Sequence, residues 1–253
     1  MTKVAVFDSG FGSLSIIKPL QKRLTADIIY FADQKNFPYG TKSVSEIKKI
    51  TASTITMLEK KFNPDLIVIG SNTPSLLLKN ISRKSKVIGV YPPLREAVKN
   101  TKSGSIAILA TKSVVKSRAL KNYIEKNVPK KIKVTKINAS PLVELVESGD
   151  FIYNKRLCKD KIKKKLLKPL LKNHIDAVTL SSTHLPFLLP MLKQIFPYVT
   201  FLDPGNSIAN QIAMISGRKK SKINTIKIFT SGNVRIFQKL LYQIGIKHKV
   251  KSL

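Results

Sequence analysis

Short apolar runs alternate along the chain with longer segments that are apolar on one side only. Runs such as Val4–Phe7 have the length of buried strands, and segments such as Ser43–Phe62 repeat apolar residues at helical spacing. Strands and helices in alternation predict an α/β fold whose sheets are mainly parallel and flanked by helices. The predicted strands are Val4–Phe7, Ile28–Phe31, Leu66–Ile69, Val87–Val90, Ile106–Leu109, Val134–Ile137, Ala177–Leu180, Thr200–Leu202 and Ile226–Phe229. The clearest predicted helices are Ser43–Phe62, Ser113–Asn127 and Arg156–Asn173.

One stretch of the chain is similar to a later one. Residues 65–73 align with residues 176–184, and in each an aspartate precedes a predicted strand and a serine follows that aspartate by six positions. The two serines are Ser71 and Ser182. Ligands of parallel sheets bind beyond the carboxyl ends of the strands. We therefore expect two pseudo-symmetric lobes, with an active-site cleft between them that contains both serines.

Proline-rich crossings suggest where the chain passes between the lobes. Tyr91-Pro92-Pro93 is a plausible first crossing, because paired prolines are extended and separate elements. Asp203-Pro204-Gly205-Asn206 is a plausible return. The first lobe is then predicted to comprise residues 1–92 and 206–253, and the second residues 93–205.

The chain is strongly basic. Its 46 Lys and Arg residues oppose 14 Asp and Glu residues, which gives a formal net charge of +32. The densest basic run, Lys155 to Lys172, has apolar residues at helical spacing and predicts an amphipathic helix with a solvated basic face. That run holds no aromatic residue on which a base would stack. Any binding of polyanions is therefore expected to be non-specific and to weaken with salt.

Cysteine content and hydropathy indicate the cellular compartment in which the protein is expected. Cys158 is the single cysteine, so neither an internal disulfide nor a cysteine-based metal cluster is expected. No apolar run reaches the roughly 18 residues of a membrane span, and the N-terminus has no signal-peptide pattern. These features favour a cytoplasmic protein without a membrane partner.

Two polar turns follow predicted strands. Asp8-Ser9-Gly10-Phe11-Gly12 opens a helix, and its glycines allow a ligand carboxylate or phosphate to approach the backbone. It lacks the third glycine of a dinucleotide fingerprint, and taken alone a tight strand-to-helix turn is the simpler explanation. Pro38-Tyr39-Gly40 is either a simple turn or a loop that lines a polar pocket.

Ser182, His184 and Asp8 are the residue types of a serine hydrolase, which is an alternative. Neither Ser71 nor Ser182 lies in the Gly-x-Ser-x-Gly elbow that such enzymes often carry. Hydrolysis is therefore disfavoured.

A series of short motifs occurs in one order along nearly the whole chain. The motifs are Asp8-Ser9-Gly10-Phe11-Gly12, Tyr30-Phe31-Ala32-Asp33, Pro38-Tyr39-Gly40, Asn72-Thr73, Ile88-Gly89-Val90, the segment from Pro141 to Gly149, Thr183-His184 and Thr230-Ser231-Gly232. In this order the chain resembles the cofactor-independent glutamate racemases. The resemblance implies that L- and D-glutamate are interconverted for peptidoglycan precursor supply, without metal, pyridoxal phosphate or nucleotide. It also implies a small acidic amino acid as ligand and a homodimer as the assembly.

The resemblance assigns roles by position. Two cysteines of that family remove and return the α-proton on opposite faces of the substrate, and polar neighbours assist them. The catalytic positions carried over are Ser71, Ser182, Asp8, Glu147 and His184. The substrate-binding positions carried over are Ser9, Pro38, Tyr39, Gly40, Asn72, Thr73 and Thr183.

The chain departs from that family where the chemistry matters most. Ser71 and Ser182 stand at the two cysteine positions, and Ser140, Ser13 and Pro92 are further departures. If the pKa of an alcohol is about five units above that of a thiol, its base form is ~10^5 scarcer, a cost of ~7 kcal/mol per base. Racemisation is therefore expected to be reduced or lost.

Several interpretations stay open at this point. The chain is an engineered Cys-to-Ser form, a natural relative that has lost or slowed racemisation, or an enzyme for a related reaction on a more acidic substrate. An aspartate racemase is the nearest alternative to a glutamate racemase. A non-catalytic protein that binds an amino acid or nucleic acid is the alternative from another class.

Overall fold

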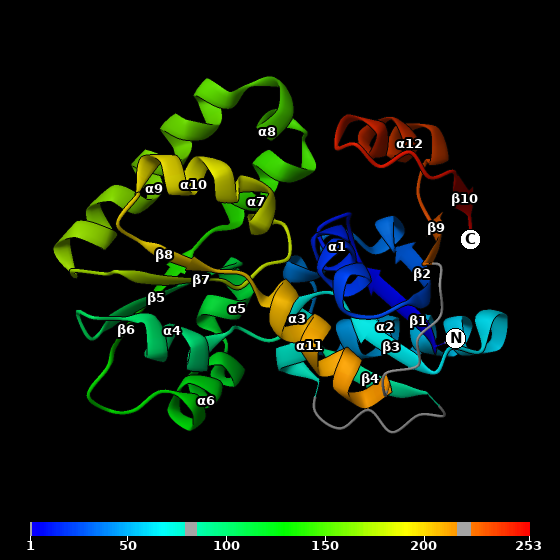
Figure 1. Ribbon diagram of the computed structural model, residues 1–253, viewed down its shortest axis with the longest axis horizontal. Helices are drawn as coiled ribbons and strands as arrows, with labels where there is room; N and C mark the ends of the chain where they lie inside the picture. The colour runs from blue at the N-terminus through cyan, green and yellow to red at the C-terminus, as the bar shows by residue number, and fades with distance from the viewer. Residues whose placement is uncertain (1, 79–84, 217–223) are drawn as a thin grey trace. The chain divides into compact units, whose positions relative to one another are not determined.

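The structure, a computed structural model, describes residues 2–78, 85–216 and 224–253 (Figure 1). It is an α/β protein with two parallel sheets flanked by helices, which confirms the predicted fold class. The chain divides into two compact units. Unit 1 comprises Met1–Val90 and Gly205–Leu253, and unit 2 comprises Tyr91–Pro204.

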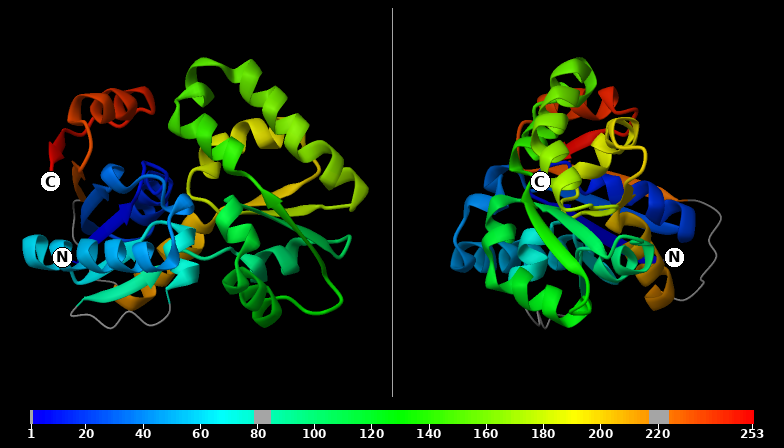
Figure 2. Two further views of the ribbon diagram at one scale, coloured as in Figure 1. Left: turned by 180° about the vertical axis from the view of Figure 1, so that it is seen from behind. Right: turned by 90° about the vertical axis from the view of Figure 1, so that its left-hand side faces the viewer.

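Unit 1 contains a six-stranded parallel sheet with the strand order β10-β9-β2-β1-β3-β4. Its elements are β1 (Thr2–Asp8), α1 (Leu14–Arg23), β2 (Ala26–Ala32), η1 (Gln34–Asn36), η2 (Tyr39–Thr41), α2 (Val44–Phe62), β3 (Leu66–Ile69), α3 (Asn72–Leu77), β4 (Lys86–Gly89), α11 (Pro204–Ser216), β9 (Thr225–Thr230), α12 (Val234–Gln243) and β10 (Val250–Ser252), where η marks a 3₁₀ helix. The final segment, α12 and β10, lies beside β9 at one edge of this sheet (Figures 1 and 2).

Both faces of the unit 1 sheet are buried. On one face, Phe7, Phe31 and Ile69 pack in a single apolar cluster with Ile55 and Leu58 of α2. The residues that alternate with them along the strands are buried as well. Near-continuous apolar strands are what a parallel sheet covered on both faces requires, and they explain why the strands could be predicted.

Unit 2 contains a four-stranded parallel sheet with the order β6-β5-β7-β8. Its elements are α4 (Leu94–Asn100), β5 (Ser105–Ala110), α5 (Lys112–Lys116), α6 (Arg118–Asn127), β6 (Lys133–Asn138), α7 (Ser140–Glu147), α8 (Asp150–Tyr153), α9 (Lys155–Lys172), β7 (Ala177–Leu180), η3 (Leu185–Leu188), α10 (Leu189–Ile195) and β8 (Thr200–Leu202). Helices α9 and α10 lie on one side of the sheet, and α4 and α6 on the other (Figures 1 and 2).

The predicted elements differ from the observed ones in a few places. Every predicted strand is present, but β4 is shifted by one residue toward the N-terminus and β10 was not predicted. The predicted helix Ser113–Asn127 is wrong as a single helix. It is interrupted at Ser117, whose backbone is extended and whose hydroxyl accepts the Leu120 N–H at 3.1 Å to cap α6.

The basic run does form one helix. In α9, a buried stripe of Cys158, Ile162, Leu166 and Leu170 faces the unit's interior, and most of the lysines are exposed. In the part of the chain that the structure describes, no helix is both long and apolar enough to span a bilayer.

Candidate functional site

The carboxyl ends of three neighbouring strands bring polar loops together in unit 1. The Gly70 N–H donates to the Phe7 carbonyl at 2.7 Å, and the Asp33 N–H donates to the Asp8 carbonyl at 2.7 Å. The loops that follow β1, β2 and β3 are therefore tied to one edge of the sheet. At this edge the Asp8 carboxylate is buried and accepts the N–H of Ser9, also buried, at 2.7 Å.

Residues Ser71 to Thr73 follow β3 and begin α3. Ser71 is the extended residue before this helix, and Asn72 and Thr73 are buried in its first turn. The Asn72 Nδ2 donates to the Val90 carbonyl at 2.9 Å, whereas its buried Oδ1 has no hydrogen-bond partner among the described residues. A buried acceptor without a partner is costly unless a ligand or water satisfies it. The Asn72 Oδ1 is therefore suited to accept a hydrogen bond from a ligand such as an ammonium group.

Ser75 braces this turn. Its hydroxyl donates to the Ser71 carbonyl at 2.7 Å and accepts the Val90 N–H at 2.9 Å. The turn after β3 is thereby attached to the residue that follows β4. Ser75 was not among the site residues expected from the sequence.

The loop that contains Tyr39 is held by a buried aspartate. The Tyr39 hydroxyl donates to Oδ2 of Asp33 at 2.9 Å, and the Asn36 Nδ2 donates to both carboxylate oxygens at 3.0 and 2.9 Å. The Ser231 hydroxyl, which follows β9, donates to Oδ1 at 3.2 Å. Burial raises the pKa of Tyr39 well above its usual value, and the nearby Asp33 carboxylate raises it further. Tyr39 is therefore a neutral phenol whose proton is already engaged.

Asp33 is the residue that the sequence analysis missed in this loop. It was quoted within a motif but not expected to act in the site. Its position directly after a predicted strand is the signal that could have identified it. Pro38 and Gly40 flank Tyr39 in the loop that Asp33 anchors.

In unit 2, three of the expected residues are in contact. Ser182 and His184 follow β7, and Glu147 is the last residue of α7. The Nε2 of His184 is hydrogen-bonded to Oε1 of Glu147, and its Nδ1 lies 3.5 Å from the Ser182 Oγ. Ser182 and His184 are both buried, as is Thr183 between them. The structure thus aligns a serine, a histidine and a glutamate within one unit.

This alignment determines the chemistry of the imidazole. An ionised carboxylate only accepts hydrogen bonds, so the Nε2 beside Glu147 carries the proton. In the neutral ring, the lone pair then lies on Nδ1, which faces the Ser182 hydroxyl. Ser182 therefore has a base beside it that is oriented by a carboxylate. Within unit 2, the acid bonded to His184 is Glu147.

Other serines have structural partners. The Ser140 Oγ accepts the Lys112 N–H at 3.0 Å, and the Ser181 hydroxyl lies 2.9 Å from that of Thr179. These hydroxyls hold the loops around β5 and β7. The described residues contain no cluster of three or more His, Cys, Asp or Glu that would hold a metal ion.

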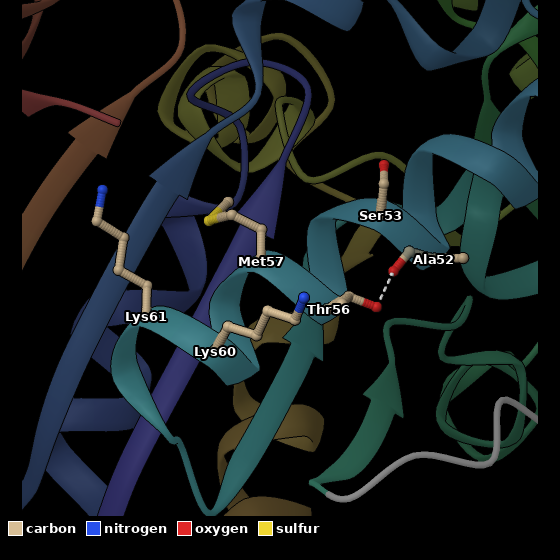
Figure 3. Close-up of a pocket in the computed structure, with 6 residues that line it drawn as sticks. All are labelled: Ala52, Ser53, Thr56, Met57, Lys60 and Lys61. Atoms are coloured by element: carbon tan, nitrogen blue, oxygen red, sulfur yellow. Dashed lines mark hydrogen bonds between the residues drawn. The ribbon is translucent and has the colours of Figure 1, made fainter.

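A shallow hollow on α2 lies apart from these residues. It is lined by side chains of α2 alone: Ala52, Ser53, Thr56, Met57, Lys60 and Lys61 (Figure 3). The Thr56 hydroxyl donates to the Ala52 carbonyl at 3.0 Å and the Ser53 hydroxyl to the Ile50 carbonyl at 2.9 Å. With its hydroxyls already used, the hollow has no converging groups for chemistry, so we assign it no role.

Comparisons with known proteins identify the family of the chain. A family model described as Asp/Glu/Hydantoin racemase matches residues 12–212. A glutamate racemase from Clostridium kluyveri is 32% identical over 253 residues, which cover 95% of this chain and 96% of that protein.

Solved structures give the same result. The glutamate racemase isoform RacE1 from Bacillus anthracis superposes with a TM-score of 0.88 at 25% identity, covering 100% of this chain and 97% of that one. Escherichia coli glutamate racemase, in complex with L-glutamate and activator UDP-MurNAc-ala, superposes with a TM-score of 0.83 at 26% identity, covering 100% and 98% of the two chains. The chain therefore belongs to the Asp/Glu/hydantoin racemase family and is, by homology, an amino-acid racemase of the glutamate racemase type.

Proposed function

We propose that this protein binds glutamate and interconverts its L and D forms by proton transfer at the α-carbon, at a rate lowered by serine at both base positions. The observation that carries the proposal is the matched pair of serines after β3 and β7, one of which lies beside His184, whose other ring nitrogen is bonded to Glu147. The biological role proposed is supply of D-glutamate for peptidoglycan precursors in the cytoplasm. No metal or organic cofactor takes part in the proposed reaction.

The proposed substrate site draws on both units. We propose that the lobes, residues 1–92 with 206–253 and residues 93–205, enclose one cleft, and that Ser71 and Ser182 act on opposite faces of the substrate. The residues proposed to bind the substrate's carboxylates and ammonium group are Ser9, Pro38, Tyr39, Gly40, Asn72, Thr73 and Thr183. Support comes from the buried, unpartnered Oδ1 of Asn72 and from the E. coli relative, whose structure contains L-glutamate.

The lowered rate follows from acidity. Removal of the α-proton needs a base, and a thiol near pKa ~8.5 supplies a useful fraction of thiolate at neutral pH, whereas an alcohol supplies almost no alkoxide. Binding does not depend on this difference, because the groups proposed to hold the substrate are all present. Affinity and turnover are therefore expected to separate.

The test compares this chain with the Ser71→Cys/Ser182→Cys double variant. L-glutamate, D-glutamate and both aspartate enantiomers are titrated by calorimetry, and racemisation is followed by circular dichroism. We expect both proteins to bind glutamate with similar affinity and the double variant to racemise it at least ~100-fold faster. Absence of binding by both proteins would refute the substrate site. Preferred binding and turnover of aspartate would replace the substrate, and equal racemisation rates would refute the role given to the thiols.

A further inference from the structure

The outward side of α9 combines positive charge with exposed leucines. The helix carries nine basic side chains and one carboxylate, that of Asp160. Leu167 and Leu171, one turn apart, are 46% and 66% exposed, and Lys164 and Lys168 are exposed beside them. Residues spaced i, i+3, i+4 and i+7 lie on one side of a helix. These four residues, Lys164, Leu167, Lys168 and Leu171, are called the outer face of α9.

The fold of unit 2 does not use this face. The helix packs against α7, α8 and α10, and its buried residues, on the side away from the outer face, are Cys158, Ile162, Leu166 and Leu170. None of the ion pairs among the described residues involves α9. The helix lies at the margin of unit 2 (Figures 1 and 2). Packing within the unit therefore does not explain why leucines stand between the outward lysines.

We propose that the outer face of α9 docks this protein on an anionic phospholipid surface. Leu167 and Leu171 enter the boundary between the lipid headgroups and the acyl chains, and Lys164 and Lys168 contact the lipid phosphates. The long aliphatic stem of lysine lets its ammonium group stay among the headgroups while a neighbouring leucine is inserted. The proposal is independent of which amino acid the protein binds.

The leucines favour lipid over other polyanions. A nucleic acid presents phosphates and base edges, so leucines against its backbone gain little, and α9 has no aromatic residue on which a base would stack. An anionic bilayer presents phosphates and an apolar boundary at the same surface. The outer face of α9, in which lysines and leucines alternate, complements both.

Docking of this kind is weak and reversible. The attraction between lysines and anionic headgroups acts within about a Debye length of the surface, and two leucines bury only a small apolar area. No membrane partner was expected from the sequence, because it has neither a spanning run nor a signal peptide. Neither feature concerns a helix that lies in the plane of the surface.

The experiment measures how the full chain partitions onto lipid vesicles. Vesicles of phosphatidylglycerol mixed with phosphatidylcholine are compared with vesicles of phosphatidylcholine alone, and bound protein is separated by sedimentation. We expect binding to the anionic vesicles that weakens with salt, and at least ~10-fold weaker binding to the neutral ones. Equal binding to both kinds of vesicle, or binding to neither, would overturn the proposal.

Paired lysine variants separate the outer face from the charge of the whole protein. Lys164→Gln/Lys168→Gln should lower the affinity for anionic vesicles at least ~10-fold. Lys48→Gln/Lys49→Gln in α2 removes the same charge at two exposed lysines and should lower the affinity much less. Equal losses in the two variants would show that total charge governs binding, and the proposal would then be wrong.

Paired leucine variants separate lipid from nucleic acid. Leu167→Ala/Leu171→Ala should lower the affinity for anionic vesicles at least ~5-fold and leave the affinity for duplex DNA unchanged. Met214→Ala/Ile236→Ala changes two exposed apolar residues of unit 1 and should leave vesicle binding unchanged. All substituted residues are exposed, so each variant should keep its fold, which circular dichroism verifies. Vesicle binding that is the same in Leu167→Ala/Leu171→Ala as in the parent chain, or tighter binding to duplex DNA than to anionic vesicles, would overturn the proposal.

Discussion

The turns after β3 and β7 are built on the same backbone plan and carry different side-chain chemistry. In unit 1 the Gly70 N–H donates to the carbonyl of Phe7 at the end of β1; in unit 2 the Ser181 N–H donates at 2.8 Å to the carbonyl of Leu109 at the end of β5. Each turn thus attaches to a middle strand of its sheet, β1 or β5. The residue that follows is Ser71 in one turn and Ser182 in the other.

The aspartates before the two strands also have matching roles. Asp65 accepts the N–H of Lys3 at 2.8 Å at the start of β1, and Asp176 accepts the N–H groups of Lys102 and Ser103 at 2.7 and 2.8 Å just before β5. Burial acts to raise the pKa of Asp176, but the hydrogen bonds from Thr101, Ser103 and Lys102 outweigh it and leave this pKa lowered. The repeat seen in the sequence is therefore a repeat of backbone anchoring.

The chemistry is not repeated. Ser182 has His184 two residues later, whereas the residue two positions after Ser71 is Thr73, which is not a base. A racemase needs a proton donor and acceptor on each face of the substrate. We therefore expect loss of the thiols to affect the two faces unequally, because Ser182 lies beside an imidazole and the matching place after β3 holds Thr73.

The largest expected effect is the difference in racemisation rate between the two single thiol variants, Ser71→Cys and Ser182→Cys. Ser71→Cys should restore more racemisation than Ser182→Cys, by at least about 10-fold. The first change adds a thiol at the position that has no matching histidine and keeps Ser182 beside His184. The second change places a thiol beside His184 and leaves serine at the position that has no matching histidine. Racemisation of both enantiomers is measured by circular dichroism.

The double thiol variant supplies the upper reference for this measurement, and calorimetric binding of glutamate shows whether each variant keeps its site. Equal gains from the two single changes would mean that the serine positions are equivalent. A larger gain from Ser182→Cys would mean that Ser71 is activated by a group outside the contacts described above.

Much of the fold could be predicted because its strands are buried on both faces. Runs such as Ile106–Leu109 are apolar throughout and stand out from their surroundings. Strand β10 could not be predicted in this way, because Lys251 and Ser252 are exposed and only Val250 is buried. The helix interruption at Ser117 was not predicted, because the apolar periodicity of the sequence continues through it.

The site was predictable in part. Strand-end positions led to Ser71 and Ser182, since parallel strands present their carboxyl ends at one edge. The pairing of His184 with Glu147 spans 37 positions and depends on how α7 packs near β7, which no local pattern reports. The network around Asp33 reaches Ser231 across 198 positions and was missed for the same reason.

A second difference between the turns is steric. Gly70 occupies the place that Ser181 takes in unit 2, and a Cβ at Gly70 would lie 2.3 Å from the Ser13 Cβ and 3.0 Å from the Phe7 carbonyl oxygen. Gly70→Ser should therefore destabilise the protein by about 2–3 kcal/mol, because a side chain is forced into a packed site. Urea unfolding followed by circular dichroism measures the loss.

Ser13→Gly serves as the partner change for this test, since it removes the nearest clashing atom. The Ser13→Gly/Gly70→Ser double variant should recover at least about half of the lost stability, a coupling that a double-mutant cycle measures directly. Ser181→Gly is the reverse change in unit 2 and should cost less, because it creates no clash. Additive effects of Ser13→Gly and Gly70→Ser would show that their contact does not limit this turn.

The smallest expected effect is the loss of folding stability at alkaline pH that ionisation of a buried tyrosine causes. Tyr39 in unit 1 is 2% exposed and bonded to Asp33, whereas Tyr91 and Tyr123 in unit 2 are stacked with ring centroids 5.5 Å apart, and Tyr91 is 39% exposed. Burial, and then the Asp33 carboxylate, raise the pKa of Tyr39, so the folded state holds this proton after the unfolded chain has released it. The stability that the neutral phenol contributes is therefore complete below pH ~10 and declines above it, by about 1.4 kcal/mol per pH unit until the folded pKa is reached.

Urea unfolding between pH 9 and 11 should show that Tyr39→Phe removes more of this decline than Tyr123→Phe does. Because the chain has seven tyrosines and no tryptophan, absorbance near 295 nm reports phenolate directly, and Asp33→Asn should move one phenol to a lower pKa. An alkaline decline that is the same in Tyr39→Phe as in the parent chain would mean that the Tyr39–Asp33 bond does not stabilise the folded protein, and that the loop is held by its contacts with Asn36 and Ser231 instead.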